Sequence, residues 1–597
     1  MQTVSDAWKE NQKQSFVNES FIRITLGFND PEASESAAAS DNGSLPIADT
    51  AQIVDGLTKT IAPYATLEQN LWVLDGERRI LPTSEYGDMG FIGDALSKAD
   101  GTFDKNPIIT IDFSEVFDTQ LPGITIGWAS AYGEYPVSFK VTAYNGASKV
   151  SEILVENNDT ADSIAWGNIN NYNRITIEIL KWCLPYHRAR ISNIFIGVGR
   201  EYTKQEITAF KAENEVDPIG STQHTSNVQF SIDNTSNDYD PNNETGLSQY
   251  LMERQEITVK YGFALEDGTV EWEDGGTYYL SQWSAPQNGL VANFTASSLL
   301  DFMTATFIKG VYRPEGISLY DLALEVLNDA NLPLNTDGSH KWFLDDSLKT
   351  IMTTAPLPLV SQAECLQYIA QAACCVLFCD RQGNLHIEPI NEQVSEDYTI
   401  SRFNSYSYPE IDLQKPLSYV EIKAYNYFIS EDDKGKEIFS GSVDINGERT
   451  VTLSYSSPAI NAKATVVGGT LTSATYYTNA CVLQITGDGS VDISVVGDIV
   501  SESTSDYITQ NADEGVEQTV SNPLITSPLH ALIVGAWVKD WLKNRKKVSG
   551  EWRADPCIDP TDKVFVENKF STNTVRISSV SLSYTGAFKG KFSGRVL

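Results

Sequence analysis

The sequence predicts a mainly β, multidomain protein with two β-barrel domains, an inserted β-sandwich jelly roll and a small α/β domain. The chain has 597 residues, too many for one hydrophobic core, which indicates roughly three to five domains. Apolar or β-branched residues recur at every second position in many short runs, as half-buried strands require. Turn residues such as Gly, Asn and Asp separate these runs.

The chain is strongly acidic, because 43 Lys and Arg against 79 Asp and Glu give a net charge of −36 at pH 7. Binding to nucleic-acid phosphates needs clustered cations, so this excess of acidic residues argues against nucleic-acid binding. The same charge suits a surface that DNA passes without sticking. No apolar run is long enough to span a membrane and residues 1–18 lack the regions of a signal peptide. We therefore expect a soluble chain without membrane insertion or a secretion signal.

Seven cysteines, an odd number without a CxxC pair, lie mostly in apolar surroundings. This pattern predicts buried thiols in a protein made in a reducing cytosol.

The N-terminal part predicts the start of a first barrel in residues 1–45 and an inserted β-sandwich in residues 46–200. Residues 5–14 suggest a short helix, residues 21–28 a strand without a nearby partner, and residues 31–44 an exposed linker rich in Ser, Ala and acidic residues. Alternating runs at 109–117, 123–146 and 174–197 predict the sandwich. Because strand 21–28 lacks a partner, we infer that the sandwich is inserted between it and the remaining barrel strands.

Residues 201–305 are predicted to complete the first barrel. Thr203 and Glu206 have the spacing of a capping box, which predicts a helix to about Glu213. Short strands then follow in quick succession, at 228–232, 256–263, 277–283 and 290–296.

Residues 306–395 are predicted to form the small α/β domain. Ser318 with Asp321, and Ser361 with Glu364, have the spacing that opens a helix, and residues 376–390 read as a hairpin.

Residues 396–597 are predicted to form the second barrel region, with a β-rich excursion at about 430–515 and a helix at about 528–547. The basic cluster 543–547 complements the C-terminal dipole of that helix. Its expected apolar stripe is Leu529, Leu532, Ile533, Ala536 and Trp541. The final hairpin, 574–592, is similar to 278–296. Either duplication or convergent hairpin design would account for this weak repeat.

Signals for an enzyme are close to absent. None of the five histidines lies in HExxH, beside a GxSxG elbow or near a plausible cysteine nucleophile. GVGREY at 197–202 lacks the third glycine of a dinucleotide loop, and 233–244 is rich in oxygen ligands but fails the EF-hand spacing. We therefore predict a protein that is not an enzyme, with no catalytic, cofactor-binding or metal residues and no cofactor.

The candidate ligand contacts are aromatic and polar side chains of the inserted sandwich. Aromatic rings bury large areas at low entropic cost and Arg makes bidentate polar contacts, both of which suit sugar binding. The alternative is a core role, as for Trp128 at a strand end or for Arg190, which alternates with Ile191 and would brace the sandwich. The candidates are Trp128, Tyr132, Tyr135, Trp166, Trp182, Tyr186, His187 and Arg188.

Residues 46–200 resemble the discoidin-like (coagulation factor type C) jelly rolls. The resemblance is carried by ITIDFSEVF, by GITIGWASAYGEYPVSFKVTAYNG and above all by the closing strand pair RITIEILKWCLPYHRARISNIFIG. It implies binding of sugars or lipid head groups through loops at one end of the sandwich.

The rest of the chain resembles the baseplate-hub (tail-hub) proteins of bacteriophages and phage-tail-like particles. The resemblance is carried by SDAWKENQKQSFVNESFIRITLGF, DNTSNDYDPNN, QEITVKYGF, TYYLSQWSAP, NFTASSLLDFM, SQAECLQYIAQAACCVLFCDRQGNLHIEPI, NPLIT, WRADPCIDPTDKVFVEN and VSLSYTGAFKGKFSGR. It implies a homotrimeric ring in which each chain gives two barrels, so that six similar units face the tail tube and three-fold symmetry faces the tip. The implied partners are a tail-tube or distal tail protein and a tip or spike protein, with DNA passing through the lumen.

The resemblance also implies a place at the virion tail tip, for a chain made in the host bacterial cytoplasm. The sequence ends directly after the last predicted strand, so wall-degrading activity is expected in another protein. The inserted sandwich is then expected to contact host-surface glycan or a neighbouring baseplate protein.

Two hypotheses therefore stand: a structural tail hub with an inserted carbohydrate-binding-type module, and a secreted glycan-binding or glycan-degrading protein with a discoidin-like targeting domain. The first depends on two alike β-modules that lie side by side around an axis, and a single continuous core would count against it.

Overall fold

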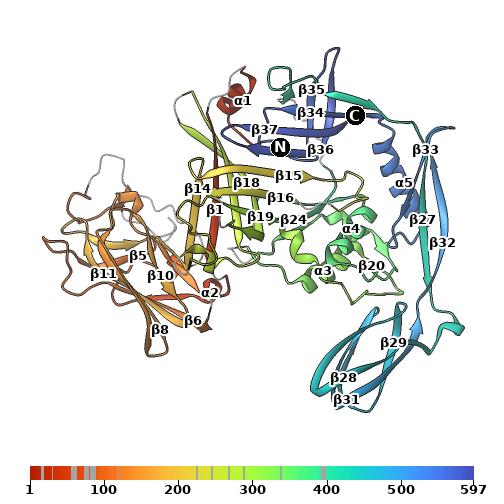
Figure 1. Cartoon of the computed structure of the whole chain (residues 1–597), viewed down its shortest axis with the longest axis horizontal. Helices are drawn as coiled ribbons and strands as arrows, with labels where there is room; N and C mark the ends of the chain where they lie inside the picture. The colour runs from red at the N-terminus through yellow and green to blue at the C-terminus, as the bar shows by residue number, and fades with distance from the viewer. Residues whose placement is uncertain are drawn as a thin grey trace.

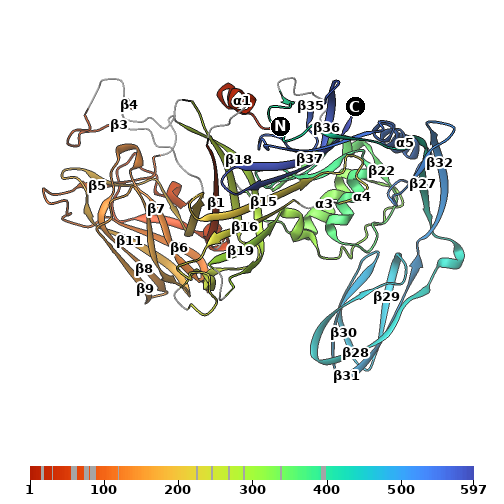
Figure 2. The same ribbon diagram turned by 45° about the horizontal axis from the view of Figure 1, so that its top comes forward.

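The computed structural model describes residues 1–14, 19–29, 31–54, 64–72, 79–80, 89–118, 120–223, 226–243, 246–266, 269–286, 290–335, 339–390 and 398–597. The protein is mainly β, with several antiparallel sheets and few helices, which confirms that part of the predicted fold class (Figure 1). A large sheet and an α/β unit form the body, a β-module lies on one side of it, and a β-rich arm projects from it (Figures 1 and 2).

The body is built on one 13-stranded sheet with two parts. The first half-sheet has the order β14 (Gly197–Thr203), β1 (Ser20–Asn29), β17 (Glu256–Ala264), β18 (Val270–Ser284), β19 (Val291–Ser297), β16 (Asn227–Asp233) and β15 (Ile207–Glu215). The second half-sheet continues from it with β36 (Thr572–Tyr584), β37 (Phe588–Val596), β34 (Lys546–Trp552) and β26 (Glu410–Leu413), while β35 (Lys563–Glu567) joins β36 to β25 (Thr399–Ile400).

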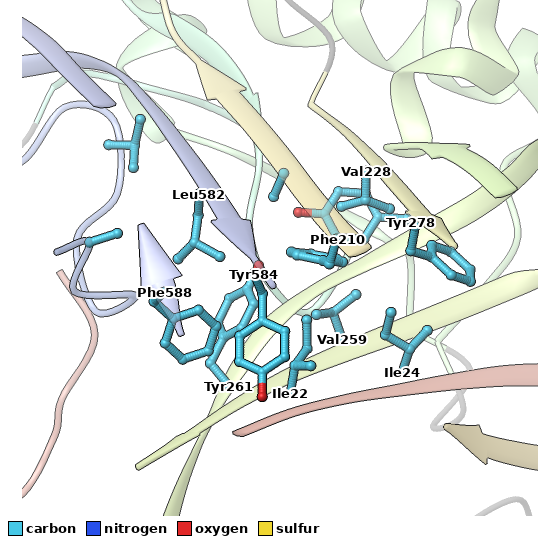
Figure 3. Close-up of a cluster of buried hydrophobic side chains, with 14 of the residues drawn as sticks. Ile22, Ile24, Phe210, Val228, Val259, Tyr261, Tyr278, Leu582, Tyr584 and Phe588 are labelled. Carbon is cyan, nitrogen blue, oxygen red and sulfur yellow. The ribbon is translucent and has the colours of Figure 1, made fainter. Parts of the chain in front are cut away.

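The two half-sheets lie side by side and share their interior. Strand β15 pairs with β36 from Phe210 opposite Tyr584 to Glu215 opposite Ser579. Behind this junction the Tyr261 ring packs edge-on against Phe588, with 5.5 Å between ring centroids (Figure 3). Buried side chains of both half-sheets belong to one cluster. The structure therefore joins the two predicted barrel regions by a continuous core.

The predicted helix from Thr203 to Glu213 is wrong. The chain instead turns at residues 204–206 and continues as β15, whose buried Ile207, Phe210 and Ala212 face the shared core. Glu206 still accepts a hydrogen bond from the Thr203 amide at 3.2 Å, as in a capping box. Pairing of β15 with β16 on one side and β36 on the other decides the outcome, since tertiary pairing overrides a local signal.

The inserted module packs two main sheets around its own core. One has the order β2 (Ala38–Asp41), β6 (Ile108–Phe117), β11 (Tyr172–Trp182), β8 (Pro136–Asn145) and β9 (Ser148–Glu156). The other has β10 (Asp162–Ile169), β7 (Leu121–Gly127) and β13 (Asn193–Phe195), and short pairs join β12 (Arg188–Ile191) to β5 (Phe91–Leu96) and β3 (Tyr64–Ala65) to β4 (Arg79–Ile80).

The module leaves and rejoins the body at neighbouring points. Asn29 at the end of β1 pairs with Gly197 at the start of β14. The residues expected to form an exposed linker, 31–44, instead include helix α2 (Pro31–Ser36) and β2, which pairs with β6 of the module.

The α/β unit contains the two helices and the hairpin that the sequence predicts. Helix α3 (Leu319–Ala330) begins at Ser318 and helix α4 (Gln362–Ala372) at Ser361, whose capping box with Glu364 is formed. The hairpin β23 (Val376–Cys379) and β24 (Leu385–Glu388) pairs with β21 (Trp342–Leu344), and β20 (Ile317–Ser318) pairs with β22 (Met352–Thr353). Short 3-10 helices lie at Thr50–Val54, Ser130–Tyr132, Leu247–Tyr250, Leu299–Met303, Asp346–Thr350 and Glu431–Asp433.

A histidine on β24 makes the stability of this unit depend on pH. His386 Nε2 lies 3.0 Å from Asp380 Oδ2, and Nδ1 lies 3.6 Å from Glu388 Oε2. Burial lowers the pKa of His386, but hydrogen bonds and attraction to both carboxylates outweigh it and raise the pKa to about 9. Because the folded pKa lies above the unfolded value of about 6.5, this stabilisation is complete below pH 6.5 and is lost as pH rises towards 9.

We therefore expect a His386→Gln variant to lose the part of the pH dependence of unfolding that falls between about pH 6.5 and 9. Thermal unfolding of both chains at a series of pH values measures this. An unchanged pH profile in the variant would contradict the assignment.

A second sheet carries helix α5 (Pro528–Leu542). Strand β27 (Leu417–Phe428) pairs antiparallel with β32 (Ser501–Gln510) and parallel with β33 (Val516–Ser521). The predicted stripe on α5 is wrong, because Leu529, Leu532 and Ile533 are exposed. The helix instead buries the face that carries His530, Ala531, Val534, Gly535 and Val538.

Gly535 explains the choice of face. A Cβ at this position would come within 2.6 Å of Thr509 Oγ1 and 3.2 Å of Ile422 Cγ1, so the missing side chain lets the helix lie close on the sheet. The helix ends at Leu542, and the basic cluster 543–547 leads into β34.

The arm is a four-stranded sheet with its own core, built from β28 (Lys436–Ser454), β29 (Ala459–Val467), β30 (Thr470–Tyr476) and β31 (Ala480–Ile499). It contacts the α/β unit where the Thr478 amide donates to the Lys309 carbonyl at 3.0 Å and Asn479 Nδ2 donates to the Leu357 carbonyl at 2.8 Å.

The N-terminal helix α1 (Asp6–Lys13), predicted at 5–14, lies against the body. Among the helices that the structure describes, none has the length and apolar character needed to cross a membrane.

Candidate functional site

The structure does not bring the eight predicted contact residues together on one surface. Trp128, Trp182 and His187 are buried, whereas Tyr132, Tyr135 and Arg188 are half-buried. Only two of the eight are well exposed: Trp166 (49%) and Tyr186 (47%).

The three buried residues belong to the interior of the module. Trp128 Nε1 donates to Ser163 Oγ at 2.8 Å. The Glu134 carboxylate accepts a 2.8 Å hydrogen bond from Trp182 Nε1, and its other oxygen lies 2.8 Å from His187 Nδ1. Because these polar atoms are paired inside the protein, they are not free to contact a ligand.

Beside Glu134 lies a buried ion pair between Arg190 and Glu68. Arg190 Nη1 donates to Glu68 Oε1 at 3.0 Å, the Arg188 amide donates to the same oxygen at 2.6 Å, and the Arg190 guanidinium lies 4.6 Å from the centre of the Tyr132 ring. Burial raises the pKa of Glu68, but attraction to Arg190 and these hydrogen bonds outweigh it and hold the pKa below its usual value. The bracing role weighed for Arg190 fits this geometry.

Sequence reasoning missed Glu68. It lies about 120 residues before its partners, and nothing in its local pattern marks it as buried. Its effect is to fix residues 64–72 against β12.

Five of the module's exposed apolar side chains lie on adjoining segments at this end of it. The Tyr186 amide donates to the Ser97 carbonyl at 3.0 Å, and Ser97 Oγ donates to the Leu184 carbonyl at 2.7 Å, which ties the turn after β11 to the end of β5. The Glu68 contacts hold the 64–72 loop beside them. We call the exposed side chains on these loops the loop cluster: Leu67, Trp72, Leu96, Leu184 and Tyr186.

The loop cluster differs from the predicted set in composition. Tyr186 is the one predicted residue in it, and its φ of 60° turns the chain at the tip. Trp166 lies on β10, opposite Gly123, and belongs to none of these loops. Leu67 and Leu184 each lie within a turn and not within an alternating run. A leucine in such a place is the sequence signal that could have indicated their exposure.

Among the residues that the structure describes, no group of three or more His, Cys, Asp or Glu side chains is placed to hold a metal ion.

No protein-family model and no curated protein sequence matches the chain. Three of the solved structures similar to it are described as tail proteins. The 43 kDa tail protein of prophage MuSo2 from Shewanella oneidensis is 11% identical, with a TM-score of 0.38 over 66% of this chain and 95% of that one. A tail protein from Neisseria meningitidis is 7% identical, with a TM-score of 0.37 over 67% and 94%. A prophage tail protein from Listeria monocytogenes is 9% identical, with a TM-score of 0.34 over 66% and 91%.

Proposed function

We propose that the chain is a structural hub of the tail tip or baseplate of a bacteriophage or phage-tail-like particle. In this proposal three copies form a ring, each half-sheet supplies one of its six β-units, and the ring joins the tail tube to the tip protein. The chain performs no catalysis, and its acidic surface lets DNA pass.

The observation that carries the proposal is the arrangement of the two half-sheets. They lie side by side and antiparallel through β15 and β36, so that one chain supplies two neighbouring β-units. The continuous core counts against two separately folded modules. The proposal therefore rests on a fused pair that enters the ring as one rigid unit, together with the sequence resemblance.

Light scattering after size-exclusion chromatography tests the ring. We expect a mass of three times the 65.8 kDa chain, either alone or after addition of tail-tube protein. A persistent monomer that hydrolyses glycans would favour the secreted-protein alternative. Negatively stained particles labelled against the chain would place it at the tail tip or elsewhere.

We further propose that the inserted module contacts carbohydrate at the host surface. Its discoidin-like pattern, its position to one side of the body and the loop cluster support this (Figures 1 and 2). Tyr186 supplies the exposed aromatic face that a sugar ring stacks on.

We expect Tyr186→Ala to weaken glycan binding by the full-length chain about fivefold, since such a stacking contact contributes on the order of 1 kcal/mol. A glycan array followed by titration of the best glycan measures this. Trp166→Ala is the matched control, because Trp166 is equally exposed but lies outside the loop cluster. A wild-type chain that binds no glycan would contradict this proposal and support the alternative that the module only packs against neighbouring baseplate proteins.

A further inference from the structure

We propose that the cleft beside strand β33 binds an extended, cationic segment of a partner polypeptide, which adds to the sheet as a strand. The cleft has a volume of about 540 Å³ and lies between β33, helix α4 and the loop that follows β15. That volume is in the range of specific ligand sites. The inference concerns a different part of the chain from the inserted module and does not depend on carbohydrate binding.

An unpaired strand edge forms one wall of the cleft. Strand β33 pairs with β27 from Val516 opposite Leu417 to Ser521 opposite Lys423. Its other side pairs with no strand in the part of the chain that the structure describes, and its residues 518–521 line the cleft. An open edge presents backbone donors and acceptors that an added strand can satisfy, as in other cases of peptide recognition by a sheet edge.

The opposite wall is held in place by hydrogen bonds. Asp217 accepts from the backbone amides of Ile219, Ser221 and Thr222 at 3.1, 2.8 and 3.0 Å, which fixes the loop after β15. Gln367 Nε2 on α4 donates to the Gly220 carbonyl at 2.8 Å. The cleft is therefore formed before a partner arrives, which lowers the entropic cost of binding.

The lining carries one negative charge, which favours a cationic over an anionic partner. Glu364 is the one carboxylate among the described lining residues, and none of them is Lys, Arg or His. Just behind the edge, Glu421 accepts a hydrogen bond from Thr519 Oγ1 at 3.2 Å. Amides and hydroxyls make up most of the remaining lining, so the surface suits a polar peptide that carries positive charge.

Titration calorimetry of the full-length chain tests this with an eight-residue peptide of alternating lysine and threonine, acetylated and amidated at its ends. We expect saturable binding of one peptide per chain. The same peptide with every backbone nitrogen methylated keeps its charge but cannot donate to the edge, and it should bind at least tenfold more weakly. A glutamate–threonine peptide should not bind.

Ser221→Trp, which fills the cleft from an exposed position, should also weaken binding at least tenfold, whereas Ser236→Trp in another exposed loop should not. Circular dichroism checks that both variants keep the fold.

Three results would overturn the proposal. The first is no binding of the lysine–threonine peptide. The second is equal binding of its methylated form, which would reduce the effect to attraction by the net charge. The third is binding of a neutral probe, maltohexaose, that Ser221→Trp abolishes, because the cleft would then be a sugar site.

Discussion

Replacing Arg381 by methionine should lower the free energy of unfolding of the body by about 3–5 kcal/mol, the usual cost of breaking a buried ion pair from one side. Arg381 lies in the turn between β23 and β24 and its side chain is 9% exposed. Its Nε and Nη2 donate to Asp559 Oδ1 at 3.0 and 2.7 Å, and Nη1 donates to the Asp274 carbonyl at 2.6 Å. One guanidinium thus connects the α/β unit to both half-sheets.

Urea unfolding followed by hydrogen exchange in β18 and β24 measures this effect at the connected elements. The matched control is Arg174→Met, which breaks an exposed ion pair with Asp112. The distance from Arg174 Nε to Asp112 Oδ1 is similar, 2.6 Å, but the two side chains are 48% and 49% exposed. This control should cost less than about 1 kcal/mol. Equal effects for the two variants would show that the Arg381 contacts do not hold the units together.

Replacing Trp8 by alanine should cost about 3–5 kcal/mol, as expected for a large aromatic side chain removed from a core. Trp8 on α1 is fully buried, and its ring packs edge-on against Phe263 of β17 with 4.8 Å between centroids. Its Nε1 donates to Asp555 Oδ1 at 3.1 Å. The helix therefore ties the first half-sheet to the segment that precedes β35.

The Trp8→Phe variant separates the contribution of packing from that of the hydrogen bond to Asp555. It keeps most of the packing and removes the hydrogen bond to Asp555, whose burial raises its pKa, so we expect a loss of about 1–3 kcal/mol. Trp72→Ala is the control for removal of an exposed tryptophan, which is 54% accessible and should change stability by less than about 0.5 kcal/mol. Calorimetric scans of the full chain measure all three. A Trp8→Ala chain as stable as the Trp72→Ala chain would contradict the packing role.

The sequence predicted correctly those helices and strands whose formation depends on residues close together in the chain. Ser361 and Glu364 form the capping box that their spacing indicates, and alternating residues correctly mark β1, β17 and β18. Thr203 and Glu206 have the same spacing but close a turn, because β36 lies more than 350 residues later in the chain and pairs with the residues that follow. No local pattern contains that information.

The same limit applies to helix faces and to the candidate site. On α5, Leu529 and Ile533 look like core residues, yet the close approach allowed by Gly535 turns the other face to the sheet. In the module, Trp182 looks like a sugar platform, but a carboxylate 48 residues away pairs with its indole nitrogen in the interior. Residue type alone cannot distinguish a ligand contact from an internal hydrogen bond.

The adjacency of Asn29 and Gly197 has an evolutionary consequence. A tight connection between these two positions would restore an ordinary hairpin, so the intervening domain can be lost, replaced or exchanged between lineages without rebuilding the scaffold. Such an exchange would leave the pairing of β1 with β17, and so the sheet of the body, unchanged.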